Sequence, residues 1–246
     1  MLEKNYWEMM TRQLPLVSRE EQEKFKNAKI AVIGCGGIGG EAIEMLARMG
    51  VGELVLVDED SFDLTNLNRQ TLATFDDLDK DKSETASSKV SAINPYVKVT
   101  SYSAHVDLDN IDKILDGCNV VVDALDNIAT RVIVSRKAME NRIPYIHGAI
   151  HGTMGQVCVF LSNTKSYEEM FGLPSLGKEL TPEVIESLKK VVSGVPPAIG
   201  PTPNLVGCLE AMEAFKIITG IGKVTVAPKI LTFDLLDFAS FNMEEI

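Results

Sequence analysis

The chain has few cysteines, few aromatic residues and little positive charge. Its 246 residues include four cysteines, one tryptophan and 6% aromatic residues, and the formal net charge is -11. A general nucleic-acid-binding protein needs a basic surface, so this negative charge argues against nucleic-acid partners. No two cysteines form a CxxC pair, which argues against a disulfide framework and against a cysteine-based zinc site; they are Cys35, Cys118, Cys158 and Cys208.

Long apolar runs are also missing. Charged residues or glycines interrupt each hydrophobic run within about 10 residues, short of the length needed to cross a membrane. The first residues, Met1-Leu2-Glu3-Lys4-Asn5, carry charges and contain no apolar signal-peptide core. We therefore expect no membrane attachment and a cytoplasmic location.

Residues 29–58 predict the opening of a doubly wound, Rossmann-like fold. A buried strand, a glycine turn, an amphipathic helix and a second strand follow one another in the order typical of a parallel α/β sheet. Further strands and helices with the same alternation follow as far as residue 140. The predicted elements are strands Lys29–Ile33, Glu53–Asp58, Val97–Ser101 and Asn119–Asp123, and helices Glu41–Met49, Lys82–Ile93 and Ala129–Glu140.

Beyond Pro144 the pattern predicts antiparallel strands that extend this mostly parallel sheet. Residues 162–203 are polar, rich in Gly and Pro, and show one short helical pattern, so we expect a mobile crossover loop there. We expect residues 1–246 to be a single domain with an N-terminal helical arm over residues 1–28. The elements predicted in this half are strands Val157–Leu161, Lys223–Ala227 and Ile230–Asp234, and helices Pro182–Val191 and Leu205–Thr219.

The glycine turn predicts a nucleotide site. Gly34 permits a tight turn, Gly36 and Gly37 let the backbone approach phosphate oxygens, and Gly39 lets the helix pack close to the strand. Asp58 follows Gly39 at close to the spacing of about 20 residues expected for a ribose-binding acid. Each feature also has a structural alternative, because the glycines could form a turn without a ligand and Asp58 could cap the turn that follows its strand. Asp60 could share either role.

Two functions use such a site. An NAD-dependent oxidoreductase needs only the glycine turn and Asp58. An ATP-dependent adenylating enzyme joins a carboxylate to the α-phosphate and expels pyrophosphate, so it also needs cations for the phosphates and a carboxylate for Mg²⁺. Arg69, Lys82 and Asp126 meet those needs and have no obvious use in nicotinamide chemistry. Their structural alternatives are solvated surface cations for Arg69 and Lys82, and a helix N-cap for Asp126.

Nearly the whole chain resembles the ThiF/MoeB/HesA family of adenylating enzymes, which are relatives of ubiquitin-activating enzyme. The resemblance implies a homodimer in which Arg12 reaches the ATP site of the partner subunit, and Asp126 binding Mg²⁺. It further implies that Asp58 binds the ATP ribose and that Asn66, Arg69 and Lys82 hold the phosphates. Asp60 and Gln70 are expected to belong to the same nucleotide-binding site. It rests on the segments Gly34–Gly39, Asn66-Leu67-Asn68-Arg69-Gln70, Val122-Asp123-Ala124-Leu125-Asp126-Asn127, Gly155-Gln156-Val157 and Gly200-Pro201-Thr202-Pro203.

The chain departs from that family at its cysteines. Many members bind zinc with two CxxC pairs, and here Ser166 and Glu169 stand at the first pair, so no zinc is expected. No cysteine lies between Leu161 and Leu205 to carry a thioester. These departures favour a small-molecule carboxylate as substrate, a cofactor precursor such as guanylylpyridinol, which a family member activates for the Fe-hydrogenase cofactor.

The alternative substrate is the Gly-Gly C-terminus of a ubiquitin-like sulfur-carrier protein, the family's commonest partner. An NAD-dependent oxidoreductase is a more remote alternative. His147 and His151 are four residues apart in a glycine-containing segment that we expect to be extended rather than helical. No metal site is expected at these histidines, and a substrate-orienting role remains open.

Overall fold

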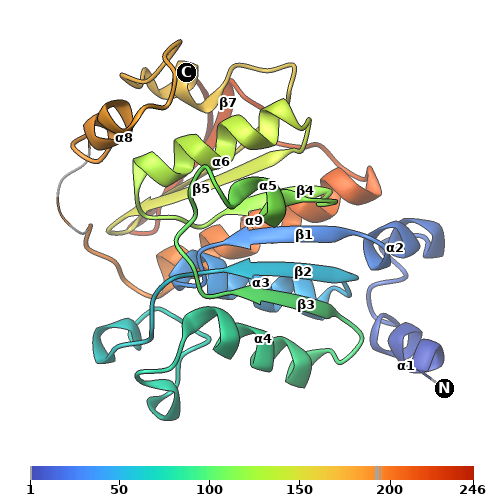
Figure 1. Cartoon of the computed structure of the whole chain (residues 1–246). Helices are drawn as coiled ribbons and strands as arrows, with labels where there is room; N and C mark the ends of the chain where they lie inside the picture. The colour runs from blue at the N-terminus through green and yellow to red at the C-terminus, as the bar shows by residue number, and fades with distance from the viewer. Residues whose placement is uncertain (1, 192–193, 195) are drawn as a thin grey trace.

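A computed structural model describes residues 2–191, 194 and 196–246 of the chain (Figure 1). Met1, in the predicted arm, and residues 192–193 and 195, in the predicted crossover loop, lie outside the described residues. The strands are β1 Lys29–Ile33, β2 Glu53–Val57, β3 Lys98–Tyr102, β4 Val120–Asp123, β5 Tyr145–His151, β6 Met154–Phe160, β7 Lys229–Asp234 and β8 Asp237–Glu245. The helices are α1 Leu2–Met9, α2 Arg19–Lys26, α3 Gly37–Arg48, α4 Lys82–Ile93, α5 Ile111–Leu115, α6 Ile128–Glu140, α7 Tyr167–Phe171, α8 Pro182–Leu188 and α9 Pro201–Thr219.

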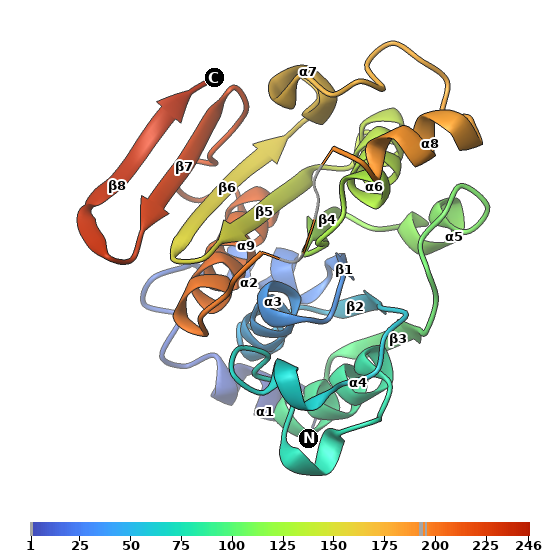
Figure 2. The same ribbon diagram turned by 90° about the vertical axis from the view of Figure 1, so that its left-hand side faces the viewer.

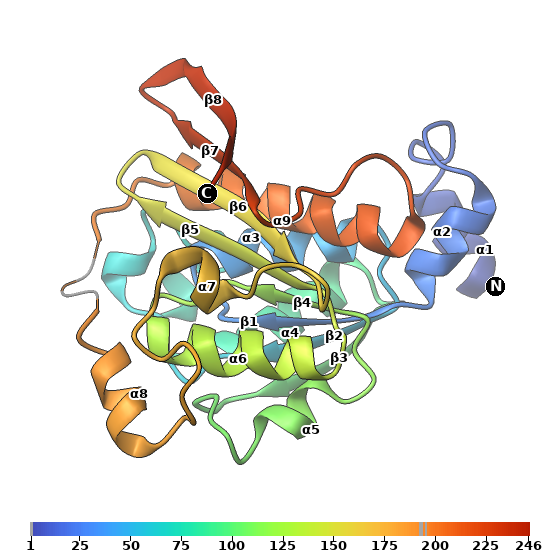
Figure 3. The same cartoon turned by 90° about the horizontal axis from the view of Figure 1, so that it is seen from above.

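The strands form one sheet in the order β3-β2-β1-β4-β5-β6-β7-β8. Neighbours from β3 to β5 are parallel, whereas β5, β6, β7 and β8 pair antiparallel. Figure 2 shows α3, α4 and α9 on one face of the sheet and α5, α6, α7 and α8 on the other, and Figure 3 shows β7 and β8 at the edge opposite β3. The predicted class, a mostly parallel α/β sheet with an antiparallel extension, is confirmed.

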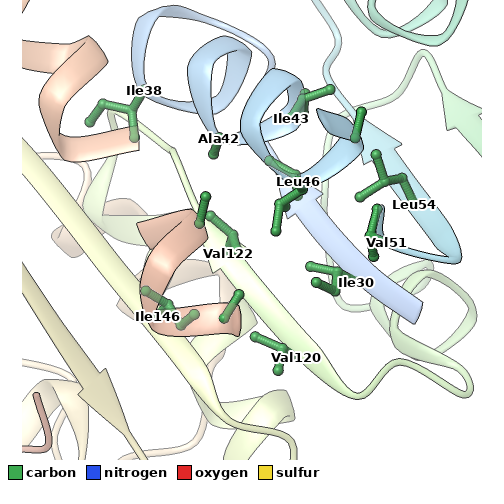
Figure 4. Close-up of a cluster of buried hydrophobic side chains, with 14 of the residues drawn as sticks. Ile30, Ile38, Ala42, Ile43, Leu46, Val51, Leu54, Val120, Val122 and Ile146 are labelled. Carbon is green, nitrogen blue, oxygen red and sulfur yellow. The ribbon is translucent and has the colours of Figure 1, made fainter. Parts of the chain in front are cut away.

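The central strands are apolar on both faces because each face is covered by helices. In β1, Ile30 and Val32 belong to the cluster under α3 and α9, while Ala31 and Ile33 belong to the cluster under α5 and α6. All four side chains are buried. Figure 4 shows the first cluster, in which side chains of β1, β2, β4 and β5 lie beside those of α3; it includes Ile30, Ala42, Ile43, Leu46, Leu54, Val120, Val122 and Ile146.

The glycine turn allows α3 to begin directly against β1. Gly34 has φ +98°, in the left-handed region that favours glycine. A Cβ atom at Gly39 would lie 1.8 Å from the carbonyl oxygen of Gly34, so the close packing predicted for Gly39 is confirmed. Helix α3 starts at Gly37, four residues before the predicted start at Glu41, because the last glycines of the turn already form its first turn.

One prediction for the antiparallel half of the sheet is wrong. Lys223–Ala227 is not a strand, since it contributes only an isolated bridge from Val226 to Val159. Side chains of α9 take up its backbone groups instead: Glu213 Oε2 accepts from Thr225 N at 3.2 Å, and Lys216 Nζ donates to Lys223 O at 2.7 Å. Strand β8, which was not predicted, forms the sheet edge, where its largely exposed residues lack the buried pattern of the other strands.

In its described part, the segment expected to be a crossover loop contains α7 as well as the predicted helix α8, and its last residues begin α9. The unpredicted helix α7 begins with a capping box between Ser166 and Glu169, a spacing visible in the sequence. Its Glu168 accepts hydrogen bonds from Arg136 of α6, at 2.6 Å from Nε and 2.7 Å from Nη2. This bidentate ion pair fixes the first part of the segment to α6. The mobility of residues 162–203 stays a prediction.

Helices α1 and α2 occupy the predicted N-terminal arm, beside the edge of the sheet where the parallel strands begin (Figure 1). Tyr6 donates to Gly50 O at 2.7 Å and Gln22 Nε2 donates to Met49 O at 2.9 Å, so the arm is attached to the end of α3. Arg12 is exposed in the turn between these helices. Within the described residues, none of the helices has the length and apolar character that a membrane span requires.

Replacing Gly39 by alanine should lower the free energy of unfolding by about 3 kcal/mol or more, because the new methyl group overlaps a backbone oxygen. Gly40→Ala is the matched control, since the nearest atoms to its Cβ would belong to side chains, Leu72 Cγ at 3.2 Å and Thr71 Oγ1 at 3.7 Å. Urea unfolding followed by circular dichroism measures both variants. Equal stability of the two would contradict the close contact of α3 and β1.

Candidate active site

A cleft of about 580 Å³ lies where the carboxyl ends of β1, β2 and β4 meet. The strand order reverses between β1 and β4, which is where ligands bind in open α/β sheets. Asn66 and Gly39 are not among the residues that line it. The predicted site residues that line the cleft are Gly34, Gly36, Gly37, Asp58, Asp60, Arg69, Gln70, Lys82 and Asp126.

The N-terminus of α3 points its first backbone N–H groups at this cleft. No acidic residue lies in the first turn of α3, and the N-cap is Gly36. The surroundings are tight: a Cβ at Gly36 would lie 3.6 Å from Gln70 Nε2, and one at Gly37 would lie 3.0 Å from Pro203 Cβ. Backbone donors at a helix N-terminus, without side chains over them, form a site for phosphate oxygens.

Asp58 is held beside the glycine turn by two backbone donors. Its Oδ2 accepts from Cys35 N at 2.7 Å, and its Oδ1 accepts from Asp60 N at 2.9 Å. Burial raises the pKa of Asp58, and the two backbone hydrogen bonds oppose that rise. A carboxylate fixed in this way can accept hydrogen bonds from ribose hydroxyls.

Two cations line the same cleft as Asp58. Lys82 Nζ pairs with Asp60 Oδ2 at 2.9 Å, and only 9% of the Lys82 side chain is exposed. The interpretation of Lys82 as a solvated surface cation is therefore wrong. Arg69 is half-buried and its Nη1 donates to Thr65 O and to Asn68 Oδ1, both at 2.8 Å.

Asn66 lies behind Arg69 rather than in the cleft. Its side chain is buried, and its Oδ1 accepts from Asp63 N at 3.2 Å in the cap of a short 3₁₀ turn. Its carbonyl oxygen accepts from the backbone N of Arg69 at 3.1 Å and of Gln70 at 2.9 Å. In this structure Asn66 shapes the chain that carries Arg69 and Gln70.

Asp126 is exposed and lines the cleft. The alternative that it caps α6 is wrong, because Asn127 is the N-cap and accepts from Thr130 N at 2.9 Å. In the described part of the chain no three His, Cys, Asp or Glu side chains come together as a metal-binding group. A carboxylate such as Asp126 fits Mg²⁺, which takes one or two carboxylates and completes its shell with water and substrate phosphates.

A buried ionic network lies beneath Asp126. Asp123 Oδ2 pairs with Arg131 Nη1 at 2.5 Å and also accepts from the Tyr145 hydroxyl. Arg131 Nη2 donates to the carbonyl oxygens of Leu125 and of Gly148, the latter at 3.0 Å. The network fixes the loop that carries Asp126 to β4 and β5. The sequence analysis gave these residues no role, although an Asp closing the apolar run of β4 was a visible clue.

His147 joins this network from the floor of the cleft. Its Nδ1 lies 3.1 Å from Asp123 Oδ2 and its Nε2 lies 3.1 Å from Gln156 Nε2. Burial, with the nearby Arg131 charge, lowers the pKa of His147 to about 4, so the imidazole is neutral at pH 7. His151 also lines the cleft but is exposed.

Glu210 of α9 is fully buried behind the same network. Among the described residues neither of its carboxyl oxygens has a hydrogen-bond partner. Burial, with the negative charge of Asp123, raises the pKa of Glu210 well above its usual range. The buried surroundings therefore favour the neutral form of Glu210.

Comparison with known proteins decides the family. A profile described as the ThiF family matches residues 10–246. The chain belongs to the ThiF family. The predicted family is thereby confirmed.

Three relatives of this ThiF-family chain are named for adenylation or activation. The SAMP-activating enzyme E1 of Haloferax volcanii is 34% identical over 90% of this chain and 78% of its own. The sulfur carrier protein adenylyltransferase of Thermus thermophilus is 36% identical over 93% and 82%. The molybdopterin-synthase adenylyltransferase of Haemophilus influenzae is 33% identical over 95% and 90%. This chain is an ATP-dependent adenylyltransferase, and the oxidoreductase interpretation has no support among these relatives.

Solved structures show the same fold. The crystal structure of PaaA aligns with a TM-score of 0.77 and 23% identity over 97% of this chain and 82% of that protein. Escherichia coli MccB aligns with a TM-score of 0.76 and 23% identity over 92% of this chain and 66% of that protein. At this identity the likeness extends to the fold alone.

The buried neutral His147 predicts that stability falls in acid. The unfolded chain takes up this proton near pH 6.5, whereas the folded protein excludes it until about pH 4. The contribution of the neutral His147 to the free energy of unfolding should therefore be fully present above about pH 6.5. The free energy of unfolding should fall by up to about 3 kcal/mol as the pH drops towards 4. Urea unfolding across this range measures the loss.

His147→Gln should remove this part of the pH dependence, because the substituted side chain has no proton to exclude. His151→Gln, at an exposed histidine of the same strand, is the matched control and should keep the full slope. The same slope in both variants would show that the loss in acid arises elsewhere.

Proposed function

We propose that this enzyme uses Mg²⁺ and ATP to adenylate the C-terminal carboxylate of a ubiquitin-like sulfur-carrier protein. The observation that carries the proposal is the cleft itself, which combines a helix N-terminus for phosphate, Asp58 for ribose, two cations and the exposed carboxylate of Asp126. These are the groups that adenylation requires, and the names of two relatives refer to activation of SAMP and of a sulfur carrier protein.

In the proposed reaction a carboxylate oxygen of the substrate attacks the α-phosphorus of ATP. The new O–P bond forms as the bond to the β-phosphate oxygen breaks, and pyrophosphate leaves with that electron pair. Arg69 and Lys82 stabilise the negative charge on the phosphates, for which Lys82 exchanges Asp60 for a phosphate oxygen. Asp126 holds Mg²⁺, which when bound supplies further positive charge at the phosphates. Asp58 fixes the ribose.

The shape of the site supports a carrier protein over a small acid. A second cavity of about 490 Å³ lies along β6, β7 and β8, and the same four residues line both it and the cleft: Ala149, Ile150, His151 and Gln156. An elongated groove of this kind suits an extended chain terminus. Guanylylpyridinol, which the missing cysteines favoured, has no counterpart in the names of these relatives, so the carrier protein replaces it as the proposed substrate.

The adenylate is proposed to be the product that leaves the enzyme. The sequence has no cysteine between Leu161 and Leu205, the segment in which some family members carry the thiol that takes over the carrier. Cys35 is fully buried, and burial raises its pKa well above the usual value, so it is a poor nucleophile despite lying in the turn.

A homodimer with two composite sites is part of the proposal. Arg12 lies with α1 and α2 at the edge where the parallel strands begin, whereas the cleft of the same chain lies at their carboxyl ends (Figure 1). In this arrangement the arm of one subunit is directed away from its own cleft. Arg12 would then add a further cation to the phosphates bound by the partner subunit.

Exchange of labelled pyrophosphate into ATP tests the activity. A sulfur-carrier protein with a free Gly-Gly terminus should support exchange, and small aromatic acids, including guanylylpyridinol, should not. Asp126→Ala and Arg69→Ala should each reduce the rate by about 100-fold or more with an unchanged melting temperature, while Asp109→Ala, at an exposed acid outside the cleft, should not. Exchange with a small acid alone would overturn the carrier-protein assignment, and full activity of Asp126→Ala would overturn its role.

Mixing two inactive variants tests the composite site. Arg12→Ala and Asp126→Ala homodimers should both be inactive, because every site lacks one group. After subunit exchange at equal concentrations, half of the dimers are mixed, and each mixed dimer has one complete site. About a quarter of the wild-type exchange rate should return, and no recovery despite proven subunit exchange would place Arg12 in its own subunit's site or outside the reaction.

A further inference from the structure

Helix α4 runs from the cleft to the N-terminal arm. Its first residue, Lys82, lines the cleft, and just beyond its last turn the ring of Tyr96 lies 6.5 Å from the ring of Tyr6 in α1. A helix of 12 residues is about 18 Å long. The cleft and the arm that carries Arg12 therefore lie at opposite ends of α4 in the same subunit (Figure 1).

The outer face of α4 is suited to burial against another helix. Glu84 lies in the first turn, and the exposed residues after it are Ser88, Ser91 and Ala92. The two serine hydroxyls donate to backbone carbonyl oxygens of the preceding turn, at 3.1 Å to Glu84 O and at 3.0 Å to Ser87 O. Covering this face therefore leaves no serine donor unpaired, and its small side chains let a second helix approach closely.

Exposed apolar side chains lie beside α4 and on the arm. Leu64 and Phe75, in the segment between β2 and α4, are 62% and 73% exposed. An ion pair from Asp77 Oδ2 to Lys89 Nζ, at 2.9 Å, fixes the part of this segment that carries Phe75 to α4. On the arm, Leu16 is 83% exposed. A contact between the arm of one copy and this segment of another would remove apolar surface from water on both sides.

The two ends of α4 also differ in charge. Residues 76–84, which lead into α4, contain five acidic residues and two lysines, and Asp76 and Glu84 are exposed. Residues 11–19 of the arm contain two arginines and no acidic residue, although the chain carries a net charge of -11. If the α4 helices of two copies lie antiparallel, the arm of each copy meets the start of α4 in the other, and opposite charges face each other.

We propose that the outer face of α4 is the centre of the homodimer interface, where the α4 helices of two subunits pack antiparallel about a two-fold axis near Ser88. The arm of each subunit then covers Leu64 and Phe75 of the other, and the partner subunit's Arg12 comes to the cleft beside Arg69. This inference rests on the proposed function, of which the composite site is a part. The antiparallel packing turns an arm that lies where its own strands begin towards the carboxyl ends of the strands in the partner.

The test places charges at the proposed two-fold axis. Ser88→Glu and Ser88→Lys each bring like charges together, so each variant alone should dimerise about 100-fold more weakly than the wild type in sedimentation equilibrium. An equal mixture of the two variants should form a heterodimer, because the substituted side chains then attract each other. Ser187→Glu and Ser187→Lys are matched controls at an exposed helical serine of α8, on the other face of the sheet, and should dimerise like the wild type.

Recovery of the heterodimer separates a change at the interface from misfolding, since two misfolded variants would not restore each other. The α4 interface is overturned if the wild type is a monomer, if both Ser88 variants keep the wild-type dissociation constant, or if the mixture recovers no heterodimer. The measurement needs no substrate. If dimerisation follows the expected pattern and no carrier protein supports pyrophosphate exchange, the proposed function has failed while the interface stands, so the two failures are distinct.

Discussion

The buried ion pair between Asp123 and Arg131 is the interaction on which the cleft depends. The side chains are 0% and 6% exposed, so both charges have lost almost all contact with water. Such a pair is stable only when the remaining donors and acceptors are satisfied, and loss of one partner leaves an uncompensated charge that costs about 3 to 5 kcal/mol. Here the spare donors of Arg131 bind the carbonyl oxygens of Leu125 and Gly148. The same contacts that offset desolvation therefore hold together the two strands that form the floor.

The ionisable groups buried beneath the floor of the cleft differ from those inside the cleft. In the buried layer, Asp123 and Arg131 form an ion pair, His147 is neutral, and burial raises the pKa of Glu210, which favours its neutral form. In the cleft, Asp60 and Lys82 form a pair with one exposed partner, and Asp126 is open to solvent. The buried groups are paired or held in their neutral forms, whereas the groups of the cleft can change partners when a polyanion enters.

Local pattern predicted the parts of the fold that are buried on both faces, and it predicted the turn between them. Strands β1, β2 and β4 are continuous apolar runs, and the glycines of residues 34–39 have a spacing that few other structures need. Strand β8 was not predicted, because its largely exposed residues lack the buried pattern of the other strands. The prediction of a strand at Lys223–Ala227 was wrong, because Glu213 and Lys216 of α9 bind backbone groups of that segment.

In the candidate site, too, residues marked by local sequence pattern were found and residues that act through long-range contacts were not. The glycine turn, Asp58, Arg69, Lys82 and Asp126 were found because each lies directly after a strand or in a family motif. Arg131, Tyr145 and Glu210 were not given roles, since their importance comes from contacts across 8 to 22 residues or from a helix far along the chain. The sequence favoured a small acid over a protein tail as the substrate, because that choice rested on the missing cysteines. Missing cysteines carry no information about the shape of the groove.

The start of α9 lies between the glycine turn and the segment that carries Arg69. Pro203 lies against Gly37 at the start of α3, and the backbone at Gly200 approaches Asn68 so closely that a Cβ there would come within 2.8 Å of its carbonyl oxygen. Val191, Pro196 and Ala198, which precede α9 in the chain, also line the cleft. The start of α9 therefore connects these residues by direct contact to the glycine turn on one side and to the Arg69 segment on the other. Any displacement of the start of α9 must move the glycine turn, the Arg69 segment or both.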